Sequence, residues 1–147
     1  MADPAVAKRA EPPDYTELLG LRSRAPLKVA EQVRAGLAYR SFERFRQHAA
    51  VGAAELAELV SIPARTLARR RSAGKLEPDE SDRLVRLARV FAQALSLFEG
   101  DASGARRWLG TPLPVLGGEA PLRAATTDPG AREVESLIGR LEHGIPA

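Results

Sequence analysis

The sequence predicts an all-α fold in which two helical parts are linked by one long central helix. Of its 147 residues, 44% are hydrophobic but only 5% are aromatic. Strands prefer β-branched and aromatic side chains, whereas this chain is rich in Ala, Leu and Arg, which favour helices. Apolar residues also recur every three or four positions, the period of a helix with one buried face. The length fits one domain, or two small domains that share a core.

The composition excludes several classes of protein. There is no cysteine, which rules out disulfides, thiolate nucleophiles and cysteine-based zinc sites. The N-terminal stretch lacks the apolar core of a signal peptide. The longest apolar-rich run, "VFAQALSLF", is far shorter than the roughly 20 residues of a membrane span. We therefore expect a soluble, cytoplasmic protein that does not bind a membrane.

Charge is spread unevenly along the chain. The formal net charge is only +3, but residues 1–98 hold 17 basic and 12 acidic residues, whereas residues 99–147 hold 5 and 7. Such asymmetry is typical of a protein in which a basic part faces nucleic acid and a second part has a different function.

Residues 1–25 are predicted to form a flexible N-terminal arm with a possible short helix. Residues 1–13 are expected to be flexible because they contain Pro4, Pro12 and Pro13 and have no apolar period. Within the arm, "YTELLGL" can form a short helix that ends near Gly20. The next helix accepts Pro26 in its first turn. Its apolar face consists of Leu27, Ala30, Val33 and Leu37.

Residues 26–78 are predicted to form a helix-turn-helix domain. Ser41 is the expected N-cap of a helix over "FERFRQHAA". A short helix over 53–59 follows, and Ser61 is then expected to cap a second helix that tolerates Pro63 in its first turn. Leu67 anchors that second helix toward the core. Two short helices joined by a tight turn, the second one basic, are typical of DNA-binding proteins.

The second of these helices carries five basic residues in "SIPARTLARRRSAGKL". Side chains on the face opposite Leu67 can reach a DNA groove, and those nearer the edge of that face are suited to phosphate contacts. Arginine can bind either guanine or phosphate. An ordinary solvated helix face is the alternative, but the short helix before it and the long helix after it favour DNA binding. The predicted DNA-binding residues are Arg65, Thr66, Arg69, Arg70, Arg71 and Lys75.

Residues 79–147 are predicted to hold the central helix and a second functional part. The helix is expected to start at Asp79 or Ser81, and the acids over 77–82 favour its positive dipole end, which explains them better than a cation site does. Its apolar stripe is too broad for one contact, so it fits the centre of the core and of a homodimer. The stripe contains Leu84, Val85, Leu87, Ala88, Val90, Phe91, Leu95, Leu97 and Phe98.

The C-terminal third contains a short helix with the only tryptophan, Trp108, and a loop "TPLPVLGGEAPL". A final amphipathic helix follows and is closed by Gly144. The apolar residues here have two interpretations, as core or as a docking surface for a partner. The apolar stripe of the final helix consists of Val134, Leu137, Ile138 and Leu141.

Enzymatic and metal-binding patterns are not found in the sequence. There is no GxSxG motif, P-loop or glycine-rich dinucleotide loop. His48 and His143 are far apart, and a metal site requires more ligands close together, so both are interpreted as surface histidines. We therefore expect no enzymatic activity, no metal and no cofactor.

Several longer segments together resemble one family. They are "GLAYRSFERF", "LAELVSIPARTLARRR", "ESDRLVRLARVFAQALSLF", "ARRWLGTPLPVLGGEAPL" and "GAREVESLIGRLEHGIPA". Over residues 26–147 the chain resembles the Xre/MbcA/ParS antitoxins of bacterial type II toxin–antitoxin systems. It departs from the family at Ala124 and Ala125, where bulkier apolar residues are usual.

The resemblance implies an Xre-like helix-turn-helix domain that binds and represses its own operator as a homodimer. It also implies a C-terminal domain that binds the cognate toxin and covers its active site; the commonest partner is a RES-domain toxin that depletes NAD. Two alternatives stay open: a stand-alone transcriptional regulator, and an adaptor that binds a protein but not DNA. By position, the resemblance implies that toxin is bound by the segment "PLPVLGGEAPL" together with the last helix and "EHGIPA". The residues singled out within them are Leu116, Gly117, Gly118, Pro121, Leu122, Leu141, Glu142, His143, Gly144 and Ile145.

Overall fold

The computed structural model describes residues 11–144, which contain helices and turns together with one isolated bridge between Ala38 and Lys75. This confirms the all-α prediction. The elements are α2 (Tyr15–Leu19), α3 (Pro26–Ala35), α4 (Tyr39–Ala49), α5 (Ala53–Leu59), α6 (Ala64–Ala73), α7 (Pro78–Leu97), α8 (Ala102–Leu109), the 3-10 turn η1 (Pro114–Leu116), α9 (Pro121–Ala124) and α10 (Asp128–Glu142).

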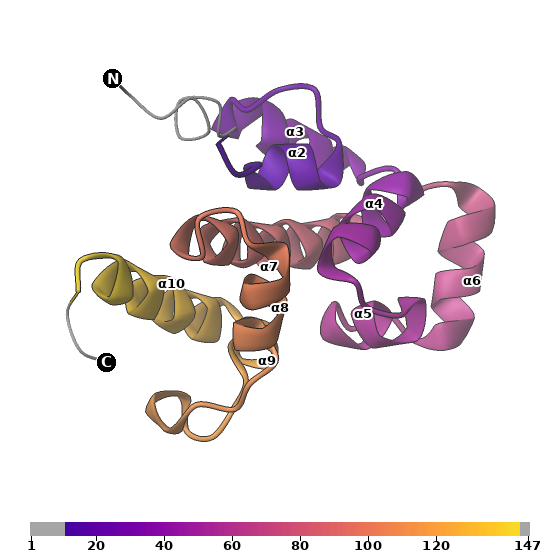
Figure 1. The fold of residues 1–147 in the computed structure, drawn as a ribbon. Coiled ribbons are helices and arrows are strands. Elements are labelled where there is room, and N and C mark those ends of the chain that lie inside the picture. Colours follow the sequence, from indigo (N-terminus) through magenta and orange to yellow (C-terminus); the bar gives the residue numbers. More distant parts are fainter. Residues whose placement is uncertain (1–10, 145–147) are drawn as a thin grey trace.

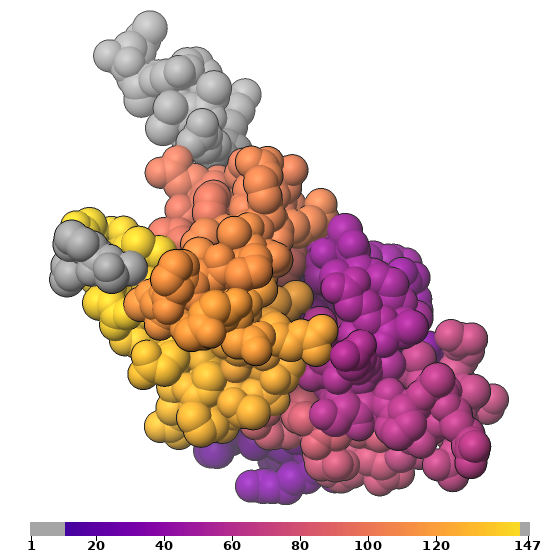
Figure 2. Space-filling model, turned by 90° about the horizontal axis from the view of Figure 1, so that it is seen from below, coloured from indigo at the N-terminus to yellow at the C-terminus, as the bar shows by residue number. Residues whose placement is uncertain are grey.

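The long helix α7 lies at the centre of the molecule and contacts both parts (Figure 1). Helices α2 and α3 lie along one side of it, and α8 and α10 lie along the other. Helices α4, α5 and α6 are grouped at one end, and α6 lies farthest from α10. Figure 2 shows the C-terminal segments, in orange and yellow, against the magenta helix-turn-helix segments.

One continuous apolar cluster runs from α2 to α10. The broad stripe of α7 explains this, because Leu84, Leu87 and Phe91 are at most 1% exposed and are covered from several directions. Phe91 packs edge-on against Phe45 of α4, with ring centroids 5.7 Å apart. Such a T-shaped pair is a favoured aromatic arrangement.

The helix in the predicted N-terminal arm is part of this core. Leu18 and Leu19 of α2 are 0% and 1% exposed. The side chain of Asp14 caps α2 by accepting a hydrogen bond from the Glu17 N–H, and Gly20 ends it at φ +70°. The short helix expected in "YTELLGL" is therefore present and ends at Gly20 as predicted. The first ten residues of the predicted flexible arm lie outside the described part.

Three predicted helix starts differ from the structure. Ser41 lies inside α4, where its hydroxyl donates to the Leu19 carbonyl at 2.8 Å instead of capping the helix. Ser61 lies in the turn at φ +57°, and Pro63 is the N-cap of α6. Helix α7 begins earlier than expected, at Pro78, with a capping box between Glu77 and Glu80.

Candidate functional site

The helix-turn-helix is fixed by a tight turn between α5 and α6. Ile62 is buried in this turn, and its N–H donates to the Ala57 carbonyl at 2.8 Å. Leu67 anchors α6 inward at 7% exposure. Gly74 ends α6 in the left-handed region at φ +75°, where glycine has no steric cost. The outward face of α6 is therefore held in a defined orientation.

That outward face is cationic. Arg65 and Arg69 are exposed, and Thr66 between them is half-buried. The Arg69 guanidinium donates to the Thr66 hydroxyl at 3.3 Å. Within residues 11–144, neither arginine forms an ion pair with an acidic side chain. Their charges are available to an anionic partner.

Arg70, in contrast, forms an ion pair within the protein, with Glu80. Its Nε and Nη2 donate to the two carboxylate oxygens of Glu80 at 2.8 and 3.2 Å. A third contact reaches Glu77 at 4.0 Å. Hydrogen bonding to Glu80 raises the pKa of the Arg70 guanidinium. The structure therefore places Arg70 as a link between α6 and α7, not as a free cation beside Arg69.

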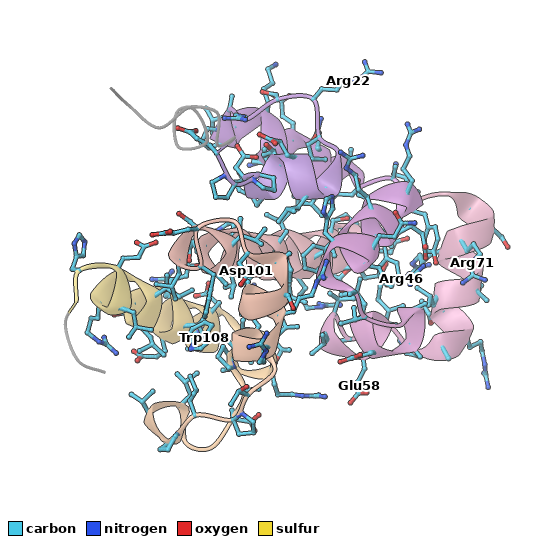
Figure 3. The ribbon with its side chains drawn as sticks, viewed as in Figure 1. Arg22, Arg46, Glu58, Arg71, Asp101 and Trp108 are labelled. Carbon is cyan, nitrogen blue, oxygen red and sulfur yellow. The ribbon has the colours of Figure 1, made fainter. Side chains whose placement is uncertain are left out.

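Arg71 and Lys75 lie at the edge of the cationic face. The Arg71 guanidinium lies 5.8 Å from the centroid of the Tyr39 ring, and its Nε donates to the Tyr39 hydroxyl at 3.4 Å. Figure 3 shows Arg71 on α6, where it remains exposed. Lys75 is exposed just beyond Gly74. Both positions suit phosphate contacts better than base contacts.

A second candidate surface lies in the C-terminal part, where α8, η1 and α10 surround an open apolar cavity of about 400 Å³. Val115, at its rim, is 48% exposed, which is unusual for a large apolar side chain in this protein. Trp108 is half-buried where α8 meets α10 (Figure 3) and packs against Phe98 with ring centroids 6.3 Å apart. The cavity is lined by Trp108, Leu113, Pro114, Val115, Leu137 and Leu141.

The loop that carries Val115 is ordered by its own hydrogen bonds. The Leu113 N–H donates to the Glu119 carbonyl at 3.1 Å, and the Gly118 N–H donates to the Leu113 carbonyl at 3.0 Å. Gly117 and Gly118 have φ values of +67° and +86°, which only glycine adopts without strain. The loop is therefore a preformed projection (Figure 1).

The residues predicted to bind toxin are spread over this part of the molecule. Pro121 is buried, while Leu116 and Leu122 are half-buried against the core. Leu141 lines the cavity. The remaining described residues are exposed, and Ile145 lies outside the described part. The exposed residues are Gly117, Gly118, Glu142, His143 and Gly144.

Four of the cavity residues lie in segments that the family resemblance implies to bind toxin, although the sequence did not single them out individually: Leu113, Pro114 and Val115 in the loop, and Leu137 in the final helix. Trp108 was weighed as core or as docking surface, and in the structure one side of it packs on Phe98 and another lines the cavity. Val115 could have been found, because a valine between a proline and a glycine pair cannot join a regular helix face.

The described part of the chain offers neither a metal site nor a membrane-spanning helix. Over residues 11–144, no group of three or more His, Asp or Glu side chains could hold a metal ion. No helix in that range is long and apolar enough to cross a membrane.

The fold and the two surfaces define a class: a helix-turn-helix protein with an additional helical domain that offers an apolar docking surface. Residues 28–89 match the Antitoxin Xre-like helix-turn-helix domain, and residues 93–144 match the Antitoxin Xre/MbcA/ParS C-terminal toxin-binding domain. The chain is 36% identical to an "Antitoxin Xre" of Yersinia enterocolitica over 128 residues, covering 86% of each chain. A second "Antitoxin Xre", of Photorhabdus laumondii, is 36% identical over 75% of each chain.

The chain therefore belongs to the Xre antitoxin family, with an Xre-like helix-turn-helix domain and an Xre/MbcA/ParS toxin-binding domain. This confirms the resemblance identified from the sequence. Members of this family are regulatory binding proteins, which also confirms the prediction that the chain is not an enzyme. A cognate toxin is the partner that the C-terminal domain defines.

Proposed function

We propose that this antitoxin neutralises a RES-domain, NAD-depleting toxin by covering its active site, and that it represses its own operon as a homodimer bound to operator DNA. In this division of labour, residues 26–78 contact DNA and residues 79–147 contact the toxin. The RES class rests on the sequence resemblance, and the contact surfaces rest on the geometry described above.

The observation that carries the toxin-binding proposal is the apolar cavity under Val115. Stable interfaces have an apolar, well-packed centre in which aromatic side chains contribute most of the binding energy. Trp108 and Val115 provide an aromatic wall and an exposed apolar rim at one site. Glu142, His143 and Gly144 lie exposed at the end of α10, one residue beyond the cavity residue Leu141. These polar residues suit the rim of the same interface.

The observation that supports DNA binding is the unpaired pair of arginines on α6. Arg65 and Arg69 are four residues apart, so they lie on the same helix face. Because Leu67 holds the opposite face in the core, this arginine face is directed outward. It is suited to the major groove, with Arg71 and Lys75 beside the phosphates.

The toxin-binding proposal is tested by co-expression with the adjacent toxin gene, with growth and cellular NAD as readouts. The wild-type chain should restore both. Val115→Asp should abolish rescue, because it places a charge in the apolar centre of the interface. Leu27→Asp is the matched control, since Leu27 is also an exposed apolar residue, 79% exposed on α3. Equal rescue by the two variants would show that the toxin interface lies elsewhere on the protein. Cellular NAD that stays constant during toxin-induced growth arrest would exclude a RES-class toxin.

The DNA-binding proposal is tested by electrophoretic mobility shift with the fragment upstream of the gene. Arg65→Ala combined with Arg69→Ala should weaken binding strongly and leave toxin rescue intact. Arg132→Ala on α10, an exposed arginine in the other part, is the control. If the double variant retains full DNA affinity, the α6 face is not the recognition surface. Sedimentation of the free antitoxin measures whether it is a homodimer.

A further inference from the structure

A second cationic site lies beside the helix-turn-helix, in a pocket of about 450 Å³ between the α2–α3 connection and the α3–α4 turn. Three arginines line it: Arg22, Arg40 and Arg44. No acidic residue lines it. A concave surface with charges of one sign focuses the electrostatic potential and attracts counter-charged groups.

Two of these arginines are free to bind a ligand. Arg22 and Arg40 are exposed, and neither forms a side-chain hydrogen bond or ion pair within the described part of the chain. Figure 3 shows Arg22 extending away from the α2–α3 connection. The nearby acids are already paired, Glu17 with Arg24 and Glu43 with Arg46. The pocket therefore has excess positive charge.

The third arginine is held in place. The Arg44 Nε donates to the Glu17 carbonyl at 3.0 Å. Its side chain also passes so close to Gly20 that a Cβ there would lie 2.9 Å from the Arg44 Cδ. Gln32 lines the same pocket, and its buried Oε1 has no hydrogen-bond partner among residues 11–144. If this side-chain amide flips, so that its oxygen and nitrogen exchange places, its NH₂ group faces the pocket and can donate to an anion.

The pocket is physically continuous with the C-terminal end of α6. The Tyr39 N–H donates to the Gly74 carbonyl at 2.9 Å, and the Leu76 N–H donates to the Leu37 carbonyl at 2.8 Å. Gly36, which lines the pocket at φ +86°, has no room for a side chain, since a Cβ would lie 2.2 Å from the Leu76 carbonyl oxygen, and the Lys75 Cε would be 3.0 Å away. Lys75 therefore borders both the pocket and the α6 surface.

We propose that this pocket binds a backbone phosphate of DNA that flanks the segment contacted by α6. Arg22 and Arg40 are the phosphate ligands, and Arg44 positions the pocket wall. Guanidinium groups bind phosphate oxygens bidentately, so an exposed pair of arginines suits this ligand. The inference rests on the proposed DNA binding and extends its footprint from α6 across Lys75 to the α3–α4 turn.

The test is the salt dependence of binding to a random-sequence DNA duplex, which isolates phosphate contacts from base contacts. The slope of log K against log salt concentration is negative, and each lost phosphate contact reduces its magnitude by about 0.9. Arg40→Gln and Arg22→Gln should each show such a loss, with equal weakening on the upstream fragment. Arg107→Gln is the matched control, because Arg107 is exposed on α8 and loses the same charge.

The outcomes separate this inference from the proposed function. A slope for Arg40→Gln equal to that for Arg107→Gln overturns the pocket proposal. If Arg65→Ala with Arg69→Ala still weakens binding in that case, α6 recognition stands alone. Wild-type protein that fails to bind either DNA overturns both proposals. Thermal unfolding of each variant checks that an exposed substitution has left the fold intact.

Discussion

The link between Arg70 and Glu80 gives the most direct test of how the helix-turn-helix is held. Glu80 is 5% exposed, and its Oε1 accepts hydrogen bonds from both the Arg70 Nε and the Glu77 N–H at 2.8 Å. Arg70→Ala removes both guanidinium bonds and leaves the buried carboxylate with the backbone N–H alone. We therefore expect a loss of stability, although Arg70 lies in a surface rich in arginine.

The magnitude follows from burial. Removing one partner of a fully buried ion pair costs about 3–5 kcal/mol. The Arg70 side chain is 20% exposed, so water can reach part of the vacated space and reduce this penalty. A hydrogen bond to a charged group contributes about 1.5–3 kcal/mol. We expect a loss of about 2 kcal/mol, which lowers Tm by about 4–8 °C for a chain of this size.

The assay is thermal unfolding followed by circular dichroism, with DNA affinity measured well below Tm. Arg69→Ala is the matched control: it should unfold like the wild type and lose DNA affinity, because Arg69 has no ion pair. Adding Glu80→Gln to Arg70→Ala should recover part of the lost stability, since a neutral amide is less costly to bury than a charge. If Arg70→Ala unfolds like the wild type and binds DNA as weakly as Arg69→Ala, the structural role of Arg70 is refuted.

Further predictions concern packing, capping and pH. Gly130→Ala should lower the free energy of unfolding in urea by about 2 kcal/mol, because its Cβ would lie 1.8 Å from the Ala124 carbonyl oxygen. Gly139→Ala on the same helix meets nothing within 4 Å and should stabilise by up to about 1 kcal/mol. Asp101→Ala should cost about 1 kcal/mol in the same assay, because Asp101 caps α8 through the Gly104 N–H. Partial burial, followed by the charges of Arg44 and Arg106, lowers the pKa of His48 below its ordinary 6.5. The unfolded chain then binds the proton more tightly, so stability falls as pH drops below 6.5 and levels off below the folded-state pKa. His48→Gln should flatten the pH dependence of the urea midpoint over this range.

The core was predictable because it depends on local periodicity. The spacing of Leu84, Leu87 and Phe91 places them on one helix face independently of the tertiary structure, and all three are buried. The breadth of the α7 stripe likewise indicated packing on several sides, which the contacts with α2 and α10 explain. Gly74 ends α6 as expected, because helix termination by glycine is a property of the backbone.

The departures arise where tertiary contacts decide the role of a residue. Arg70 and Arg69 are adjacent and chemically identical, but a rotation of about 100° along the helix turns Arg70 toward Glu80, ten residues later. Ser41 has the residue type of an N-cap, but the Leu19 carbonyl is a partner that sequence spacing cannot reveal. The exposure of the Val115 side chain likewise depends on how the loop closes through Leu113 and Glu119, which its position in the sequence does not show.

The central helix also decides how the two activities can be separated. Phe91 of α7 packs against Phe45 of α4, while α10 packs along another face of α7. The parts are also linked at the surface, where Arg106 donates to the His48 carbonyl at 2.7 Å and Arg123 pairs with Glu58 at 3.3 Å. A boundary near residue 79 would therefore divide the proposed contact surfaces, but it does not divide folding units. Cutting there would expose apolar side chains on both sides, so the two activities can be separated only through exposed side chains of the intact chain.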